Sequence, residues 1–234
     1  MFTHPLRILF ATAALLAFAG PLAPSPASAQ SAQSAQLEQD VIDAARNSVH
    51  KLRSDPDLGA LNTLLARAKG VLVFPSLLKA GFFFGAEGGS GVLLARDERG
   101  TWSAPAFYTM GSGSFGLQFG VQQSENVLVI MTDRGLEKVL STQFKLGLDA
   151  GVALGPVGRG VAAATTLALG ADIYAYSNAR GLFGGVALDG SVIYPRDDWN
   201  RAYYGQPVSA REIVIQNKVT HAGVNELRVS LAAR

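Results

Sequence analysis

The apolar residues near the start of the chain recur with the period of an amphipathic helix. This period predicts two helices, over residues 36–53 and 58–69. Acidic residues come early in the first helix and basic residues late, which suits the helix dipole. An Asp-Pro-Asp sequence separates the two, and Gly70 is placed to end the second helix.

From residue 71 onward the pattern changes to the alternation of β-strands. Strands are predicted over residues 71–74, 81–96, 102–110, 115–122, 126–132, 144–155, 167–176 and 184–193. The first of them is expected to end at Pro75. Glycine is abundant on one face of several strands, and the chain has 26 glycines in 234 residues, against a usual share of about 7%. Such positions are needed where another backbone approaches closely or where a sheet coils tightly.

Short helices return in the C-terminal part of the chain. They are predicted over residues 134–141 and 197–204, and Ser209 with Glu212 has the spacing of a capping box that opens another helix. The predicted fold class is therefore α+β: a strongly curved, antiparallel, barrel-like and glycine-rich sheet with N-terminal amphipathic helices and short C-terminal helices.

The last residues are predicted to form an edge strand, because Leu227, Val229 and Leu231 alternate with polar positions. No linker-like stretch interrupts the predicted elements before them. We therefore expect residues 36–234 to form a single domain.

The first thirty residues have the organisation of a secretory signal peptide. Arg7 is their only charged residue, an apolar stretch follows over residues 8–20, and Ala27 and Ala29 form an A-x-A site. This apolar stretch is shorter than the ~20 residues that a membrane span requires. We expect cleavage before Gln30, with residues 1–29 as the signal peptide and 30–35 as a flexible tail. The protein is then exported, and is periplasmic or secreted.

The composition excludes several classes of site. The chain has no cysteine, which excludes disulfides, thiolate metal sites and a lipoprotein anchor. Its net charge is only +2 and no Lys/Arg-rich run occurs, which argues against a nucleic-acid partner. With 48% hydrophobic and 16% charged residues, the chain has enough apolar residues for a substantial core.

No catalytic, metal or cofactor site is predicted. Residues 111–116 match G-x-G-x-x-G, but an alternating strand pattern follows them instead of the helix that a dinucleotide site needs. After cleavage only His50 and His221 remain, in unlike contexts. These patterns predict that the protein is not an enzyme and needs no cofactor.

Several motifs between residues 36 and 215 occur in the order of one known domain. The most specific are Gly-Thr-Trp-Ser-Ala-Pro at 100–105 and Arg-Gly-Leu-Phe-Gly-Gly-Val at 180–186. Others are Ala-Lys-Gly-Val at 68–71, Lys-Ala-Gly-Phe at 79–82 and Gly-Pro-Val-Gly-Arg at 155–159. In these motifs the chain resembles the SYLF domain, also called the Ysc84 or lipid-binding actin-regulator domain. The resemblance implies a non-enzymatic domain that binds membrane phospholipids, phosphoinositides among them.

The resemblance also indicates which residues bind lipid. Family members use an amphipathic N-terminal helix and basic residues of the domain, some of them beside glycine-rich turns where backbone N–H groups can help hold a phosphate. In this chain the matching bases are Arg46, Lys51, Arg53, Lys69, Lys79, Arg159 and Arg180. The helix over residues 36–53 has two possible roles: it lies in the headgroup layer of a membrane, or it caps the core of the sheet.

The expected partner is an anionic phospholipid membrane surface, to which the exported protein binds peripherally. Some family members bind actin, but an exported chain would not meet cytoplasmic actin, so no actin partner is expected. Two alternatives remain at this point. One is an outer-membrane β-barrel, favoured by the signal peptide and the alternating strands. The other is a scaffold of the cell envelope whose ligand is another protein.

Overall fold

The fold is built around one curled sheet of eight strands. The structure is a computed structural model that describes residues 26–81, 84–115, 120–154, 170–181 and 191–232. The strands are β1 (Gly70–Gly81), β2 (Phe84–Ala95), β3 (Ala106–Phe115), β4 (Gly120–Ile130), β5 (Phe144–Lys145), β6 (Val152–Leu154), β7 (Ile173–Gly181) and β8 (Val192–Pro195). The helices are α1 (Pro26–Ser54), α2 (Gly59–Arg67), α3 (Asp133–Val139), α5 (Asp197–Tyr204), α6 (Ala210–Val214) and α7 (Asn225–Ala232), with short 3-10 helices at Pro56–Leu58 and Ala222–Val224.

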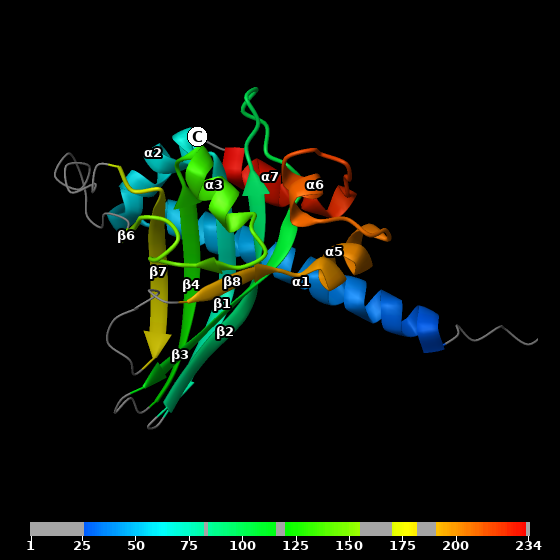
Figure 1. The fold of residues 1–234 in the computed structure, drawn as a ribbon, viewed down its shortest axis with the longest axis horizontal. Helices are drawn as coiled ribbons and strands as arrows, with labels where there is room; N and C mark the ends of the chain where they lie inside the picture. Colours follow the sequence, from blue (N-terminus) through cyan, green and yellow to red (C-terminus); the bar gives the residue numbers. More distant parts are fainter. Residues whose placement is uncertain (1–25, 82–83, 116–119, 155–169, 182–190, 233–234) are drawn as a thin grey trace, which may run out of the picture.

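The strand order is β5-β8-β3-β2-β1-β4-β7-β6. Neighbouring strands are antiparallel except β6 and β7, which are parallel. The sheet curls like half of a barrel, with β8 crossing in front of the central strands and α1 behind them (Figure 1). The predicted α+β class is confirmed.

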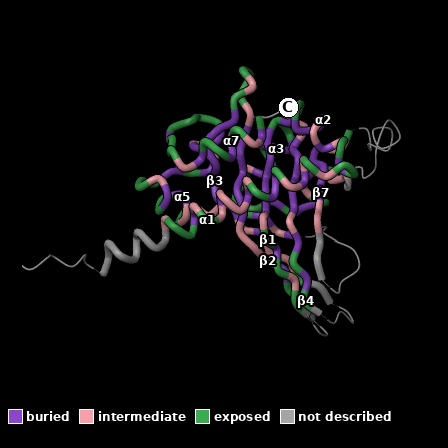
Figure 2. The backbone as a smooth tube through the Cα atoms, turned by 180° about the vertical axis from the view of Figure 1, so that it is seen from behind, coloured by how far each residue is buried: buried purple, intermediate pink, exposed green. Residues whose placement is uncertain are grey.

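Helices pack on both faces of the sheet, and each face has its own apolar core. We call the side covered by α1, α2 and α7 the α1 face, where Val71, Val129 and Tyr176 are buried. We call the side covered by α3 and α6 the α3 face, where Leu72 and Leu128 are buried. The buried backbone is concentrated where helices cover the sheet (Figure 2).

The apolar stripe of α1 caps the core on the α1 face. Its residues Ile42, Ala45, Val49 and Leu52 are each at most 1% exposed. Of the two roles left open by the sequence, this structure therefore shows the capping role. The helix extends from Pro26, ten residues before its predicted start. Within the described residues, no helix combines the length and apolar character that a transmembrane span requires.

Strand β1 does not end at Pro75, as the sequence suggested, but continues to Gly81. A bulge makes this possible, because the pairing register shifts between Val73 and Leu78 toward β2, and between Phe74 and Leu77 toward β4. The bulged strand packs closely on two glycines of β2. A Cβ on Gly91 would lie 2.3 Å from the carbonyl oxygen of Val73, so close backbone approach explains the glycine here.

The predicted strand over residues 144–155 was wrong as one element. The chain forms β5, turns at Gly147, whose φ is +83°, and resumes as β6 at the opposite side of the sheet. The Asp149 carboxylate accepts a hydrogen bond from the Lys145 N–H at 2.6 Å and closes this turn. Of the next two predicted strands, 167–176 and 184–193, residues 167–169 and 184–190 lie outside the described residues, residues 173–176 lie in β7, and residues 192–193 lie in β8.

The C-terminal helices agree with the sequence in two places and differ in one. Helix α5 has the predicted bounds, and α6 opens with the predicted capping box of Ser209 and Glu212. The predicted edge strand was wrong, because residues 225–232 form α7. Leu227 and Leu231, four residues apart, face the core, whereas Val229 is 66% exposed. Residues 111–115 of the G-x-G-x-x-G match lie within β3, as expected for a strand and not for a dinucleotide loop.

Candidate functional site

The three bases predicted on α1 are engaged in contacts within the protein. Arg46 forms an ion pair with Glu226 of α7. The Lys51 Nζ donates to the Glu125 carboxylate of β4 at 2.6 Å. Both pairs hold α1 against elements that lie far away in the sequence.

Arg53 joins three helices at the end of α1. It donates to the side-chain oxygen of Asn62 in α2 at 2.7 Å and to the carbonyl oxygens of Ser230 and Leu231 in α7 at 2.5 and 3.3 Å. Burial lowers the pKa of its guanidinium. The cations of α1 therefore attach the helix to the domain in this structure.

The remaining predicted bases do not form one site. Lys69 precedes β1, where its N–H donates to the Ile130 carbonyl at 2.8 Å, and Lys79 lies near the other end of this strand. Ten residues of β-strand span about 30 Å, so the two lysines belong to opposite ends of the sheet. Arg159 lies outside the described residues.

Lys79 and Arg180 are brought to the same end of the sheet. Lys79 of β1 lies opposite Gln122 of β4, and Arg180 of β7 lies opposite the next residue, Gln123. We call this part of the sheet, made of residues 78–80, 86–88, 111–113 and 121–123, the open end. Its strands project beyond the helices that cover the rest of the sheet (Figures 1 and 2).

On the α3 face, the open end carries a polar row across four strands. The row runs through Ser112, Glu87, Lys79 and Gln122, which lie directly opposite one another in register. Glu87 is only 8% exposed. Burial raises the pKa of its carboxyl, and the charge of Lys79 partly opposes this shift.

On the α1 face, the open end is apolar and exposed. Leu78 and Val121 are 53% and 60% exposed, although residues higher on the same strands are fully buried. Ala80 lies opposite Val121 and Ala86 lies opposite Ala80, and both alanines are exposed. Gly113 completes this row, and the row of Leu78 is completed by Gly88, Gly111 and Gln123. We call Leu78, Ala80, Ala86 and Val121, with the three glycines, the apolar patch.

The apolar patch consists of aliphatic side chains and glycines and carries no formal charge. A Cβ added at Gly111 or Gly113 would meet no atom within 4 Å, so nothing in the described structure covers these positions. Strands β1, β2 and β4 are each paired on both sides and offer no free backbone edge to an added strand. Among the residues that the structure describes, no cluster of metal-ligating side chains occurs.

Sequence reasoning found Lys79 and Arg180 but missed the apolar patch. Leu78 and Ala80 were assigned to no strand, because Pro75 was expected to end the pairing. Val121 was placed in an alternating strand, but its exposure depends on how much of β4 is covered by α1, which the strand pattern does not show. The only available signal was that apolar positions alternate beyond Pro75 in two neighbouring hairpins.

The comparisons with known proteins agree with one another on the family. The family model described as Ysc84, Las17-binding protein actin regulator, matches residues 111–234. SH3 domain-containing YSC84-like protein 1 of Bos taurus is 34% identical over 176 residues, which are 75% of this chain and 51% of that protein. LAS seventeen-binding protein 3 of Saccharomyces cerevisiae is 37% identical over 154 residues, 64% of this chain and 33% of that protein.

These comparisons bear on two expectations. The chain spans about half the length of the first relative and a third of the second. The name of the second relative describes a binding protein, and neither name describes an enzyme, which is consistent with a non-enzymatic role. The expectation that excluded actin is not borne out, because the family description itself names an actin regulator. Because the family model matches more than half of the sequence, the chain belongs to the Ysc84 (SYLF-domain) family.

Proposed function

We propose that this protein binds anionic phospholipid membranes through the open end of its sheet and catalyses no reaction. The observation that carries the proposal is the exposed, uncharged apolar patch at the same end of the sheet as Lys79 and Arg180. Such a combination is typical of surfaces that lie in the interfacial layer of a bilayer, where apolar groups enter the lipid and bases meet phosphates.

The bases and the apolar patch of the open end make different contributions to the free energy of membrane binding. A base near an anionic membrane contributes about 1 kcal/mol. Lys79 lies on the opposite face of the sheet from the apolar patch, directly opposite Glu87, so it and Arg180 together supply at most about 2 kcal/mol, which alone gives weak binding. Burial of apolar surface adds about 25 cal/mol per Å². Leu78 and Val121 are already more than half exposed, and they can transfer to lipid without unfolding any part of the sheet.

The shape of the patch favours lipid over a peptide. Its strands β1, β2 and β4 are paired on both sides, and a Cβ added at Gly111 or Gly113 would meet no atom within 4 Å, so these glycines border no wall that could hold an anchoring side chain. A fluid lipid layer can adapt to an exposed apolar surface of this kind without a strand edge or a pocket. Phosphoinositides, whose headgroups carry additional phosphates, are the proposed preferred anionic lipids because they place more charge near each base.

Vesicle flotation of the purified protein tests this function. The variant Leu78→Asp/Val121→Asp places charges in the apolar patch, and Leu148→Asp/Val229→Asp is the matched control because those side chains are 75% and 66% exposed elsewhere. We expect wild type and control to float with vesicles of phosphatidylcholine mixed with phosphatidylglycerol or a phosphoinositide, and the patch variant to stay behind. Equal flotation of all three, or of none, contradicts the proposal.

The proposed location is outside the cytoplasm, as a peripheral protein of the periplasm or the cell exterior. The apolar stretch and A-x-A site of residues 1–29 support it. Cleavage before Gln30 would remove the first four residues of α1, Pro26–Ala29, and leave its buried stripe intact. Intact-mass measurement on the protein recovered from its own cells should find a chain that begins at Gln30. A chain that keeps residues 1–29 contradicts the export proposal.

A second candidate function is binding to actin or to a Las17-like protein. The match to a family described as a Las17-binding actin regulator favours it. Co-sedimentation with actin filaments, in the presence and absence of vesicles, tests this candidate. Binding to filaments by both wild type and the Leu78→Asp/Val121→Asp variant would assign actin to a surface other than the open end.

A further inference from the structure

The open end contains one acidic residue, Glu87, and its carboxyl is buried. Glu87 is 8% exposed. Within the part of the chain that the structure describes, its carboxylate accepts no hydrogen bond and forms no ion pair. Burial without hydrogen-bond donors disfavours the ionised form of a carboxyl relative to the protonated form.

Lys79 is the one charged residue that lies opposite Glu87 in the polar row. It is the direct partner of Glu87 on β1, whereas Ser112 on β3 and Gln122 on β4 are neutral. Arg180 of β7 belongs to the adjacent row, on the side of the apolar patch. Burial raises the pKa of the Glu87 carboxyl, and the charge of Lys79 opposes this rise in part. Among the described residues, no other titratable group acts on this carboxyl.

Glu87 lies at the same level of the sheet as the apolar patch. Its chain neighbour Ala86 belongs to the patch, and so do Leu78 and Ala80 on either side of Lys79. Adjacent residues of a strand point to opposite faces and differ by only about 3.4 Å along the strand. When the apolar patch enters the interfacial layer of a membrane, Glu87 therefore enters it to the same depth.

An anionic membrane favours the protonated form of Glu87 at this depth. The negative surface potential attracts protons and repels a carboxylate, and the loss of water further destabilises the ionised form. The only charged residues of the open end are Lys79 and Glu87. Protonation of Glu87 changes their summed charge from zero to +1, which strengthens attraction to lipid phosphates.

We propose that docking of the open end on an anionic membrane is coupled to the uptake of a proton by Glu87, so that the protein binds more tightly as the pH falls. This inference rests on the proposed membrane function and adds a regulation to it. By linkage, one proton taken up on docking changes the binding constant by at most about tenfold per pH unit. The change occurs between the pKa of Glu87 in the free protein and its higher pKa in the docked protein.

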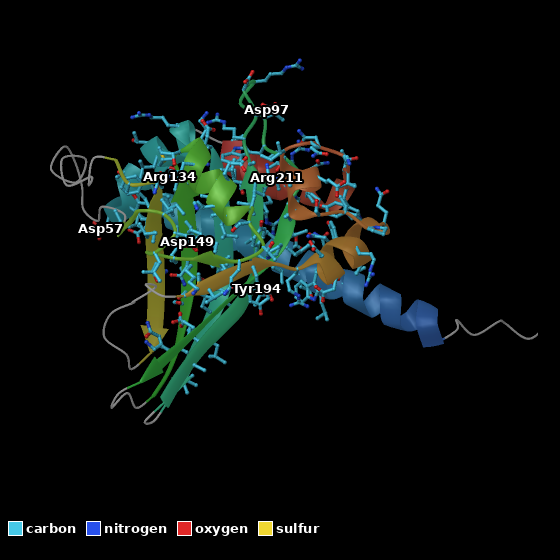
Figure 3. All side chains as sticks on the ribbon, viewed as in Figure 1. Asp57, Asp97, Arg134, Asp149, Tyr194 and Arg211 are labelled. Atoms are coloured by element: carbon cyan, nitrogen blue, oxygen red, sulfur yellow. The ribbon has the colours of Figure 1, made fainter. Side chains whose placement is uncertain are left out.

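Vesicle flotation between pH 5 and pH 8 tests the coupling. The vesicles contain phosphatidylcholine and phosphatidylglycerol, whose phosphates stay ionised throughout this range. The variant Glu87→Gln imitates the protonated carboxyl. The matched control Glu98→Gln removes the same charge from an exposed side chain. Glu98 follows Asp97, which Figure 3 shows at the other end of the sheet from the open end.

We expect wild type and the control to bind about three- to tenfold more tightly at pH 5 than at pH 8, as for part of one linked proton. Glu87→Gln should bind at pH 8 about as tightly as wild type at pH 5, with little change on acidification. Equal binding of wild type at all pH values, or an unchanged pH dependence in Glu87→Gln, overturns the coupling and leaves the membrane function standing. Absence of flotation at every pH overturns both.

Proton uptake on mixing gives a second readout that wild type alone can supply. In weakly buffered solution at pH 6.5, a pH-indicator dye should report a rise in pH when wild type binds the anionic vesicles. Glu87→Gln should take up fewer protons at the same amount of bound protein, whereas Glu98→Gln should match wild type. Binding of wild type without proton uptake, or equal uptake by all three proteins, contradicts the assignment to Glu87.

Discussion

Glu38 of α1 has a buried carboxyl that lacks full hydrogen bonding. It is 1% exposed, and its Oε2 atom has no hydrogen-bond partner. Burial raises the pKa of this carboxyl above its usual value. The carboxyl holds its proton more tightly in the folded protein than in the unfolded chain, so protonation of Glu38 stabilises the fold. This contribution is fully present below pH 4.5 and is lost as the pH rises through the folded-state pKa.

The variant Glu38→Gln should therefore stabilise the protein at neutral pH. Its amide keeps the shape of the protonated carboxyl and has no charge to bury, and each unit of raised pKa corresponds to about 1.4 kcal/mol of free energy of unfolding. Urea unfolding at pH 7.5 and pH 4.5 measures the difference. The gain should be clear at the higher pH and should shrink at the lower one. A gain of equal size at both values contradicts the assignment to burial of charge.

Gly91 and Gly59 make a matched pair for the role of glycine. A Cβ on Gly91 would lie 2.3 Å from the Val73 carbonyl oxygen and 2.6 Å from the ring of Phe74, whereas at Gly59 nothing lies within 4 Å. We expect Gly91→Ala to lower the free energy of unfolding by about 1–3 kcal/mol through overpacking, and Gly59→Ala to raise it by about 0.4–1 kcal/mol. Thermal or urea unfolding that finds the same sign for both would refute the close approach of β1 and β2.

At the scale of elements, the question is whether α1 must leave the sheet to bind lipid. The structure buries its apolar stripe and ties its bases to α7 and β4. Because the chain has no cysteine, Lys51→Cys and Glu125→Cys can be joined selectively by a short bis-maleimide. We expect the crosslinked protein to float with anionic vesicles as well as the uncrosslinked variant. Flotation that disappears on crosslinking would assign lipid binding to a released α1.

Local signals allowed the sequence to predict some elements closely. Helices α5 and α6 were predicted well because acidic first-turn residues and the Ser209–Glu212 capping box act within a few residues. Helix α7 was mistaken for a strand, because Leu227 and Leu231 fit both periods and only the exposure of Val229 separates them. The bulge at Pro75 could not be predicted, since it depends on glycines of the neighbouring strand.

At the scale of the whole molecule, binding surfaces depend on which residues the fold leaves uncovered. The sequence identified seven bases by type and motif, but it could not show that those of α1 are paired, or that Lys69 and Lys79 lie at opposite ends of the sheet. Nor could it show that Leu78 and Val121 are exposed while apolar neighbours along the same strands are buried. Both facts require the helices to be placed on the sheet.

The central claim is that the open end of the sheet enters a lipid layer. A single cysteine, Val121→Cys, carrying a polarity-sensitive fluorophore reports on it directly, and Val229→Cys, 66% exposed on α7, is the matched control. Both cysteine variants have the same residues 1–25, so any contribution of that segment to vesicle binding is equal in the two. With vesicles that contain phosphatidylglycerol, the account predicts a blue-shifted emission that a lipid-phase quencher reduces at position 121 and no change at position 229. An unchanged spectrum at position 121 on protein that floats with the vesicles would contradict it.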